Sequence, residues 1–291
     1  MTDERKRRKR NERQEPPQQP TRSRFTERDG KVIRAVYEYR LLSQKQAHRL
    51  LFTDTNPKTA QRRLAYLYDS GYLDRRFLHS AGGMMNSPTL YVLDKGGNDW
   101  LMRTDGLDET RWQPGEMRVG YEHLEHLLAI NTFRIEVELA CRQQGYPLLT
   151  WIDDTTLKKD YDRVRVVGSK DPVPVIPDGY FCIETPKGKN HFFLEMDRGS
   201  MPSKRFKLKI RAYQAYHQSG LALKRFGTEK FRVLTVIESQ KRLELLKKAT
   251  EDAEGRNRFW FGVLSGLTSE TLFAEPVWNV AGRTERTLLL Q

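Results

Sequence analysis

The chain has 291 residues, and its 51 Lys and Arg outnumber its 38 Asp and Glu, which gives a formal net charge of +13 at pH 7. The mean hydropathy is -0.73, and no apolar run approaches the roughly 18 residues that a membrane span needs, so a membrane-spanning protein is excluded. Excess positive charge of this size favours a polyanionic partner, double-stranded DNA above all; a membrane surface is disfavoured because no basic amphipathic helix with an aromatic face stands out.

Residues 1–24 are highly charged and rich in Pro and Gln. Such a segment is predicted to be a disordered basic arm that adds phosphate contacts without selecting a DNA sequence; the alternative is a solvated tail with no role. No apolar segment follows it, so it is not a secretory signal. Cys141 and Cys182 match neither a disulfide framework nor a zinc site. We therefore expect two reduced core cysteines in a cytoplasmic protein.

Residues 25–104 show three helical periods followed by two strand-like runs. Thr26, Ser43 and Asn56 stand where helix N-caps are expected. The runs 72–78 and 89–93 predict a β-hairpin. Three helices followed by a hairpin are typical of a winged helix-turn-helix domain, in which the third helix enters a major groove and the hairpin is the wing.

Basic and polar side chains cluster on this predicted third helix and on the first strand of the hairpin. The candidates for contact with DNA bases or phosphates are Lys58, Thr59, Arg62 and Arg63 on the helix, and Arg75 and Arg76 on the wing. Two alternatives remain open, because an exposed basic helix face is often only solvated and some winged helices contact proteins instead.

The rest of the chain predicts a second domain of mixed α/β type. A linker over 105–119, rich in Gly, Asp and Thr, precedes a domain over 120–255, and a C-terminal extension covers 256–291. In this domain the predicted order is a long helix, a strand, an irregular insertion over 157–175, a hairpin, a basic helix, a buried strand and a helix. A mixed sheet with helices on both faces is the natural packing for this order.

Three acids lie in or beside apolar strands in the stretch from Val175 to Ser200. Asp178 precedes the first strand of the predicted hairpin, and Glu195 and Asp197 lie near the end of the second. Because side chains alternate along a strand, Glu195 and Asp197 point to the same face of the sheet.

The pairing of the two strands decides whether these acids meet. A turn centred on 187–188 sets Asp178 opposite Asp197 and Tyr180 opposite Glu195, which predicts three carboxylates at one end of the sheet. A shift in register would change this pairing. Hard oxygen ligands of this kind suit Mg²⁺ or Mn²⁺. The alternative is that Asp178 caps a turn and Asp197 pairs with Arg198 or another surface Arg.

The motif "IPDGYF", followed by the acid of "FFLEMDRGS", resembles the PD-(D/E)xK nuclease superfamily. Together with the preceding winged helix and the later "KLKIRAY", the chain resembles the replication-relaxation family of plasmid and mobile-element proteins. The resemblance implies a restriction-endonuclease-like fold after the winged helix, with Asp178 and Glu195 as metal ligands. It also implies a role in plasmid replication and DNA relaxation.

The chain departs from the superfamily pattern at Asp197, where the resemblance implies a lysine. Some superfamily members carry this cation on the following helix, which is lysine-rich here. Lys207 and Lys209 are the candidates, with Lys209 favoured because it lies four residues before Tyr213. The same helix carries Lys204 and Arg205. The alternative is that the whole basic helix lies along a DNA backbone.

Two hypotheses follow. In the first, the protein nicks or cleaves DNA with Mg²⁺ or Mn²⁺, and the metal-binding and catalytic groups come from Asp178, Glu195, Asp197, Lys209 and Lys207. In the second, it is a non-catalytic DNA-binding regulator or replication accessory with a degenerate nuclease fold. In either case a homodimer or replication and mobilisation proteins are candidate partners.

Overall fold

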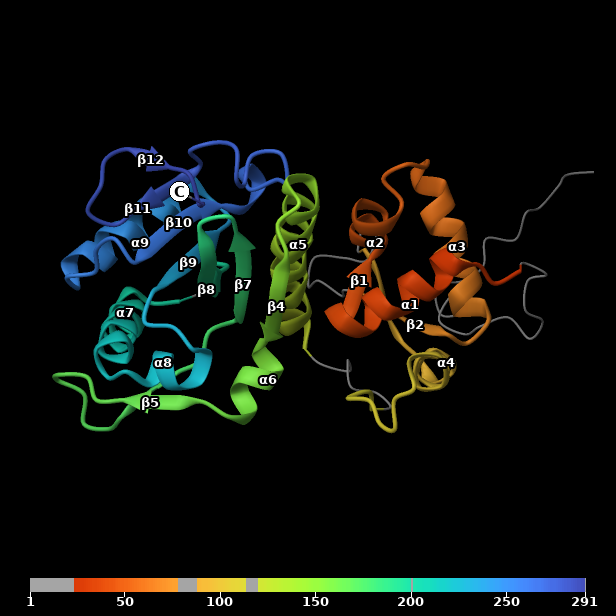
Figure 1. Cartoon of the computed structure of the whole chain (residues 1–291), viewed down its shortest axis with the longest axis horizontal. Helices are drawn as coiled ribbons and strands as arrows, with labels where there is room; N and C mark the ends of the chain where they lie inside the picture. Colours follow the sequence, from red (N-terminus) through yellow and green to blue (C-terminus); the bar gives the residue numbers. More distant parts are fainter. Residues whose placement is uncertain (1–23, 78–87, 114–119, 200, 291) are drawn as a thin grey trace, which may run out of the picture. The chain divides into compact units, whose positions relative to one another are not determined.

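The computed structural model describes residues 24–77, 88–113, 120–199 and 201–290. The chain divides into two compact units, residues 1–132 and 133–291, and the division falls inside the long helix α5 (Tyr121–Gln144) (Figure 1). Both units combine helices with sheets, so the fold is mixed α+β with one large mixed sheet. The predicted basic arm at 1–23 and the loop at 78–87 lie outside the described residues.

The first unit packs helices around a small antiparallel sheet of strand order β1-β3-β2. Before α5, its described elements are α1 (Glu27–Tyr39), β1 (Leu41–Ser43), α2 (Gln44–Leu51), α3 (Pro57–Asp69), β2 (Leu73–Phe77), β3 (Thr89–Leu93) and α4 (Lys95–Asp105). The three predicted caps are confirmed: the side chains of Thr26, Ser43 and Asn56 accept hydrogen bonds from backbone N–H groups in the first turns of α1, α2 and α3.

The apolar face predicted for the third helix is the buried face of α3. Ala60, Leu64 and Leu67 are fully buried. Tyr66 is also buried. Its ring lies under the guanidinium of Arg63, 4.5 Å from ring centroid to Cζ. Stacking beneath an arginine therefore draws this side chain out of solvent.

Helix α4 was not predicted, because its first turn contains two glycines, Gly96 and Gly97. Asp94 caps it by accepting a hydrogen bond from the Lys95 N–H at 2.7 Å. A Cβ added at Gly97 would lie 2.3 Å from the carbonyl oxygen of Tyr72. Glycine at this position therefore allows close packing of the helix against the backbone before β2, and does not mark a linker.

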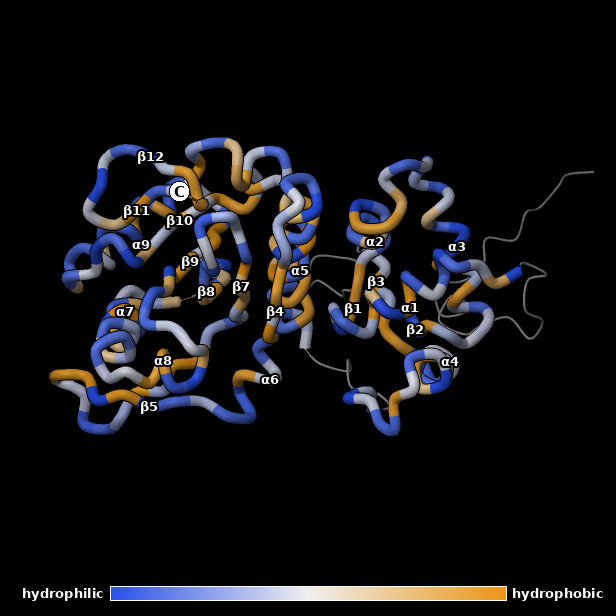
Figure 2. The backbone as a smooth tube through the Cα atoms, viewed as in Figure 1, coloured by the Kyte–Doolittle hydropathy of each residue, from blue (hydrophilic) through white to orange (hydrophobic). Residues whose placement is uncertain are grey.

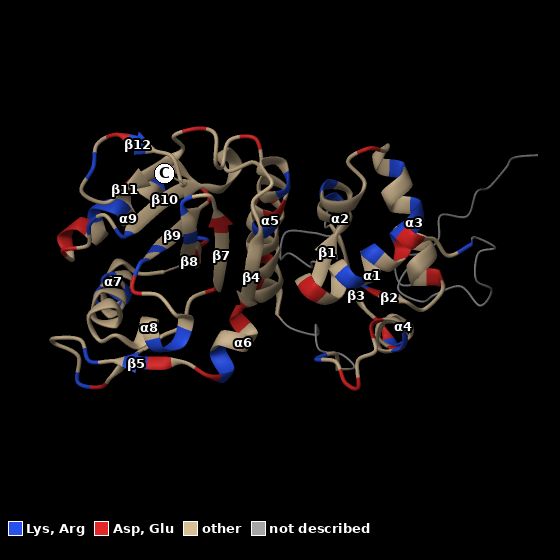
Figure 3. Ribbon diagram, viewed as in Figure 1, with Lys and Arg blue, Asp and Glu red and all other residues tan. Residues whose placement is uncertain are grey.

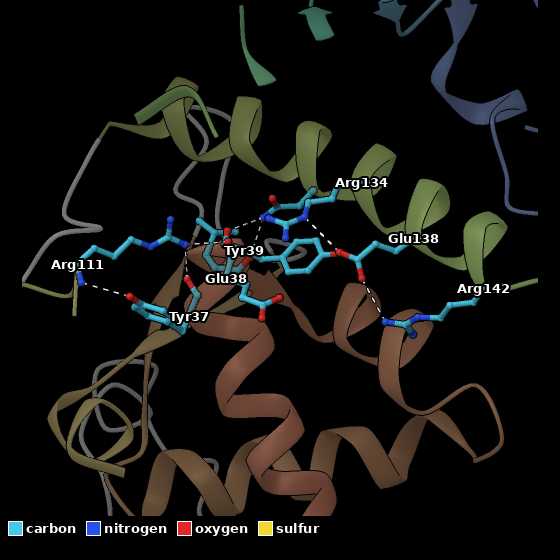
Figure 4. Close-up of polar contacts among 9 residues, drawn as sticks. Tyr37, Glu38, Tyr39, Arg111, Arg134, Glu138 and Arg142 are labelled. Carbon is cyan, nitrogen blue, oxygen red and sulfur yellow. Dashed lines mark hydrogen bonds and ion pairs between the residues drawn. The ribbon is translucent and has the colours of Figure 1, made fainter. Parts of the chain in front are cut away.

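Part of the segment predicted as a linker is bound to the first unit. The Arg111 guanidinium donates hydrogen bonds to the carbonyl oxygens of Tyr37 and Glu38, at 2.7 and 2.9 Å, and stacks over the Tyr37 ring. Figure 4 shows these contacts at the end of α1. Arg111 therefore anchors this part of the predicted linker to the first unit.

The second unit is built on a seven-stranded sheet of order β12-β11-β10-β9-β8-β7-β4. Strand β9 is parallel to both β8 and β10, and the remaining pairs are antiparallel. The described strands of the second unit include this sheet and the separate β5–β6 pair. They are β4 (Leu148–Asp153), β5 (Asp162–Val164), β6 (Val173–Val175), β7 (Gly179–Thr185), β8 (Gly188–Asp197), β9 (Phe231–Ile237), β10 (Phe259–Val263), β11 (Trp278–Val280) and β12 (Arg286–Thr287). After α5, its helices are α6 (Asp154–Lys159), α7 (Ser203–Gln218), α8 (Leu221–Phe226), α9 (Gln240–Asp252) and the 3₁₀ turn Leu264–Gly266.

Alternating side chains on the central strands fill two core layers, one on each face of this sheet. On one face, Tyr180 and Phe193 join the cluster made with α7 and α9. On the other, Phe181 contacts Phe133 of α5 edge-on at 6.1 Å and stacks on Phe192 at 4.8 Å. Figure 2 shows apolar stretches within these strands beside hydrophilic ones. The sheet is covered on both faces, as its central parallel strands require.

The sheet of this unit continues past residue 255, and one prediction within the unit was wrong. The C-terminal extension supplies β10, β11 and β12, so residues after 256 complete the sheet. The insertion over 157–175 is not irregular: it ends α6 and forms the β5–β6 hairpin, whose Val164 and Val175 are buried in the core. Short strands separated by charged residues gave too weak a period to be recognised.

The predicted hairpin register was wrong by two residues. Tyr180 pairs with Phe193 and Thr185 pairs with Gly188, so the turn consists of residues 186–187. Proline fits the first position of such a turn because its φ is fixed. A shift of two residues keeps every side chain on its predicted face, and places Asp178 beside the Glu195 end of β8.

Both cysteines are free and buried, as predicted. Burial raises the pKa of the Cys141 thiol to about 12, so the thiol is unreactive at neutral pH. No helix in the described part of the chain has both the length and the apolar character needed to cross a bilayer.

Candidate functional site

A carboxylate–lysine cluster forms where β7, β8 and α7 meet. Asp178 lies just before β7, Glu195 lies near the end of β8, and Lys209 lies in the second turn of α7. The Lys209 Nζ forms an ion pair with Glu195 Oε2. This contact joins two of the residues that the sequence selected, and the charge of the third, Asp178, acts on both of them. Of the two candidate lysines, the favoured one reaches Glu195.

Glu195 is almost fully buried and is held on both oxygens. Its side chain is 7% exposed; Oε2 accepts from Lys209 and Oε1 accepts from the Tyr213 hydroxyl. The pKa of the Glu195 carboxyl is raised to about 7, and burial is the main cause. The charge of Asp178 adds to the rise, and the Lys209 ammonium opposes it. Burial and Glu195 together raise the pKa of Tyr213, so its hydroxyl stays protonated and donates a hydrogen bond to Glu195.

Lys209 is held as a cation by the same group. Burial by itself would lower the pKa of the Lys209 ammonium, but the charges of Glu195 and Asp178 outweigh it and the net shift is upward. The side chain remains 24% exposed. Its charged end thus lies over two acids while part of the side chain stays accessible to solvent.

Asp178 is fixed to the neighbouring strand by backbone contacts. Its N–H donates to the carbonyl oxygen of Leu194 at 2.9 Å, and its Oδ2 accepts from the Met196 N–H at 2.8 Å. The residue is half-buried, and Pro177 before it is buried. Both contacts reach β8, and not the local turn that the alternative assigned to Asp178. It is tied across to β8 beside Glu195.

Asp197 does not join this cluster, which corrects the prediction of three convergent carboxylates. Its Oδ1 and Oδ2 accept from Nε and Nη2 of Arg242, at 2.8 and 3.0 Å, and Oδ1 also accepts from the Gly199 N–H at 2.9 Å. The Asp197 side chain is 4% exposed. A bidentate arginine satisfies this carboxylate, as the alternative reading anticipated, although the partner is Arg242 rather than Arg198.

Within the described ranges, no group of three or more His, Cys, Asp or Glu side chains is placed to hold a metal ion. The donor set that remains at the cluster is the pair Asp178 and Glu195. Mg²⁺ is commonly held by one or two carboxylates and completed by waters and phosphate oxygens, and an oxygen that accepts one hydrogen bond keeps a second lone pair. The two carboxylates therefore fit Mg²⁺ or Mn²⁺ as a minimal ligand pair.

The other candidate cations of α7 have different surroundings. Lys207 Nζ pairs with Asp252 Oδ2 of α9 at 2.9 Å, which separates it from Glu195. Lys204 and Arg205, in the first turn of the helix, are exposed. The buried side chains of α7 include Phe206, Ile210, Tyr213 and Tyr216, and His217 is exposed.

The candidate DNA-contacting residues of the first unit fall into two groups. Lys58 and Arg62 are exposed on α3, and Thr59 beside them is half-buried. Arg63 instead pairs with Asp29, which is fully buried, through Nε at 2.9 Å and through Nη2. Figure 3 shows basic positions along α3.

The arginines predicted on the wing are also engaged within the first unit. Arg75 lies over the Tyr68 ring, 4.0 Å from its centroid, and 5.5 Å from the Tyr91 centroid. Arg76 forms an ion pair with Asp74. The Arg75 contacts hold β2 to α3 and β3, whereas the Arg76 pair lies within β2. Both guanidinium groups are thus engaged within the first unit, in addition to any contact with DNA.

Sequence reasoning missed two residues of this region, Tyr213 and Arg242, as partners of the acids. Tyr213 was used only to favour Lys209, which lies four residues before it on one helix face, and that spacing was a usable signal for the tyrosine as well. Arg242 lies 45 residues from Asp197, and no local pattern indicates such a pairing.

Comparison with known proteins gives one family match. The family model described as "Replication-relaxation" matches residues 33–230. The chain belongs to the replication-relaxation family. This match spans the helices of the first unit and extends through β7, β8 and α7, so it includes Asp178, Glu195 and Lys209.

Solved structures give weaker likenesses. The chain is similar to the restriction endonuclease FokI (11% identity, TM-score 0.29, covering 82% of this chain and 42% of that chain). It is also similar to FokI bound to DNA (12% identity, TM-score 0.26, covering 82% and 43%). The chain thus matches less than half the length of either FokI chain, and these TM-scores are too low to establish a shared fold. No curated protein matches the chain.

Proposed function

We propose that this replication-relaxation family member is a DNA-processing protein that nicks or cleaves phosphodiester bonds with a divalent cation. The observation that carries the proposal is the cluster of Asp178, Glu195 and Lys209, which meets the donor set of a PD-(D/E)xK site with the lysine supplied from α7. The second unit is then a restriction-endonuclease-like domain whose lysine has moved from strand to helix.

The chemistry divides among the cluster residues. Asp178 and Glu195 would hold Mg²⁺ or Mn²⁺, which when bound supplies charge that polarises a phosphodiester and lowers the pKa of a water. Lys209 offsets the negative charge that develops on the phosphate, because it keeps its proton in this environment. Tyr213 fixes the orientation of the Glu195 carboxylate through its hydroxyl.

The first unit, in this proposal, is a winged helix-turn-helix domain that places the protein on double-stranded DNA. Helix α3 would enter the major groove and present Lys58, Thr59 and Arg62, while the β2–β3 hairpin is the wing. Exposed Lys204 and Arg205 on α7 would contact phosphates beside the cleavage site. The net charge of +13 is consistent with a polyanionic partner.

Supercoiled plasmid incubated with the protein and Mg²⁺ or Mn²⁺ tests the proposal. Wild type is expected to convert it to relaxed or linear forms, and Asp178→Ala to leave it supercoiled while still shifting linear DNA in a gel. Asp171→Ala, which removes an exposed acid in the loop between β5 and β6, is the matched control and should cleave like wild type.

A second candidate function, a non-catalytic DNA-binding regulator or replication accessory, is favoured by one observation. The position where the superfamily carries lysine holds Asp197, which is bound by Arg242. Plasmid that stays supercoiled with wild type and both metals, together with a mobility shift that weakens steeply with salt, would establish this candidate instead.

A further inference from the structure

Strand β9 brings an unassigned hydroxyl next to the carboxylate–lysine cluster. β8 and β9 are parallel neighbours, and Glu195 is in register with Thr235 (Figure 1). Neighbouring strands lie about 4.8 Å apart, and residues in register project from the same face of a sheet. The Thr235 side chain therefore shares the face on which Glu195 meets α7.

Thr235 is 1% exposed, and its Oγ1 has no hydrogen-bond partner among the residues that the structure describes. A buried hydroxyl without a partner destabilises the fold, and valine would fill the same volume without that cost. Buried polar groups in folded proteins nearly always have a partner, so an orphaned one needs an explanation.

The surroundings of Thr235 on this face are polar on one side only. Val233 and Ile237, two residues before and after it, belong to the apolar core, and so does Phe261, its neighbour in register on β10. Across on β8 its neighbour is Glu195. The hydroxyl thus lies at the boundary between the apolar core and the proposed metal site.

We propose that Thr235 is a positioning residue of this site, whose hydroxyl binds a water molecule that enters with the divalent cation held by Asp178 and Glu195. This inference rests on the proposed function, because it assigns a role to the hydroxyl only if the two carboxylates bind a cation. A threonine hydroxyl suits the role because it both donates and accepts hydrogen bonds.

The experiment compares the full chain with Thr235→Val and Thr235→Ser, using Thr250→Val and Asp178→Ala as references. Thr250 is buried like Thr235, but its hydroxyl already donates to the Leu246 carbonyl oxygen at 2.9 Å. Mn²⁺ binding is measured by calorimetry without DNA, the Mg²⁺ dependence of plasmid nicking gives a second value, and the midpoint of thermal unfolding reports the fold.

Thr235→Val is expected to weaken Mn²⁺ binding about tenfold, at the low end of the 10- to 100-fold effect of outer ligands at metal sites. Its unfolding midpoint should be equal to or above that of wild type, because the substitution removes an unsatisfied hydroxyl. Thr235→Ser should bind Mn²⁺ within about threefold of wild type, since it keeps the hydroxyl, and Thr250→Val should bind like wild type.

Two outcomes overturn the inference alone. One is wild-type Mn²⁺ binding by Thr235→Val while Asp178→Ala loses binding. The other is equal loss of binding by Thr235→Ser and Thr235→Val together with a lowered unfolding midpoint, which marks a packing role. Absence of Mn²⁺ binding and nicking by wild type, with Asp178→Ala indistinguishable from it, overturns the proposed function and this inference with it.

Discussion

Two acid–cation pairs lie two residues apart on β8, and they differ in what surrounds them. Glu195 pairs with Lys209 of α7, and Asp197 pairs with Arg242 of α9. The burial is similar, with the acids 7% and 4% exposed and the cations 24% and 20% exposed. Burial by itself therefore does not distinguish a structural pair from a reactive one.

The neighbours of each pair make the distinction. Arg242 binds Asp197 through two parallel hydrogen bonds and also donates to the Met201 carbonyl oxygen at 2.7 Å, so every contact ties β8, α9 and the start of α7 together. Glu195 has a second acid, Asp178, close enough to raise the pKa of its carboxyl. Two carboxylates beside one lysine have more negative than positive charge, so a further cation would stabilise them. A carboxylate paired with one arginine has no such excess of negative charge.

Removing the lysine from the Glu195 pair is expected to have the largest effect. Lys209→Met should lower the nicking rate about 10²- to 10³-fold, the scale on which loss of one group that stabilises transition-state charge is felt. Binding of linear DNA should remain close to wild type. Single-turnover nicking and a mobility shift measure the two quantities.

Lys207→Met is the matched control, because it removes the same charge from the same helix but from a side chain that pairs with Asp252. Its nicking rate should stay within a few-fold of wild type. Equal losses for the two variants would mean that α7 contributes only its overall charge, and the contrast between the two β8 pairs would disappear.

Breaking the Asp197 pair should reduce stability rather than alter chemistry. Arg242→Leu leaves a buried carboxylate without its partner, and a loss of about 3 kcal/mol in unfolding free energy is expected. Urea denaturation measures the loss. Asp197→Asn combined with Arg242→Leu should recover part of it, because the uncompensated charge is then gone.

Arg198→Ala provides the surface reference for this prediction. Arg198 pairs with Glu238, whose side chain is 53% exposed, at 3.2 Å, and exposed pairs contribute less than about 1 kcal/mol. An Arg242→Leu variant no less stable than Arg198→Ala would show that the buried pair does not hold the end of β8.

The smallest expected effect concerns neighbouring arginines of α3. Arg62→Ala should weaken DNA binding and reduce the slope of log affinity against log salt by about 0.9, the contribution of one phosphate contact. Arg63→Ala should instead lower the unfolding free energy, because Asp29 is fully buried and loses its partner. Fluorescence anisotropy at several salt concentrations, with urea denaturation alongside, separates the two. An unchanged slope for Arg62→Ala would place that residue outside the DNA contact.

Much of the fold could be predicted from local pattern. The three helix caps, the hairpin strands and the faces of the β8 side chains follow from short-range rules, and the structure agrees with them. The hairpin register and helix α4 could not be predicted, because a two-residue turn at 186–187 and the close approach of Gly97 to Tyr72 depend on contacts across the fold. The β5–β6 hairpin gave too weak a period to be recognised.

The candidate site was predicted in part for the same reason. Asp178, Glu195 and Lys209 were selected by residue type, spacing and resemblance. The separation of Asp197 from them was not, since its partner Arg242 comes from a helix 45 residues later. Tyr213 and Thr235 carry no motif, and only the packing of α7 and the register of β9 bring them to Glu195.

The sequence by itself determined which residues can do chemistry in this protein, because charge, caps and strand alternation act over a few residues. Only the tertiary structure decided which acid keeps a lysine and which is bound by an arginine. Glu195 and Asp197 lie on the same strand and have the same local sequence pattern. In a low-dielectric interior their different roles come from the charged and polar groups that distant elements bring into contact with them.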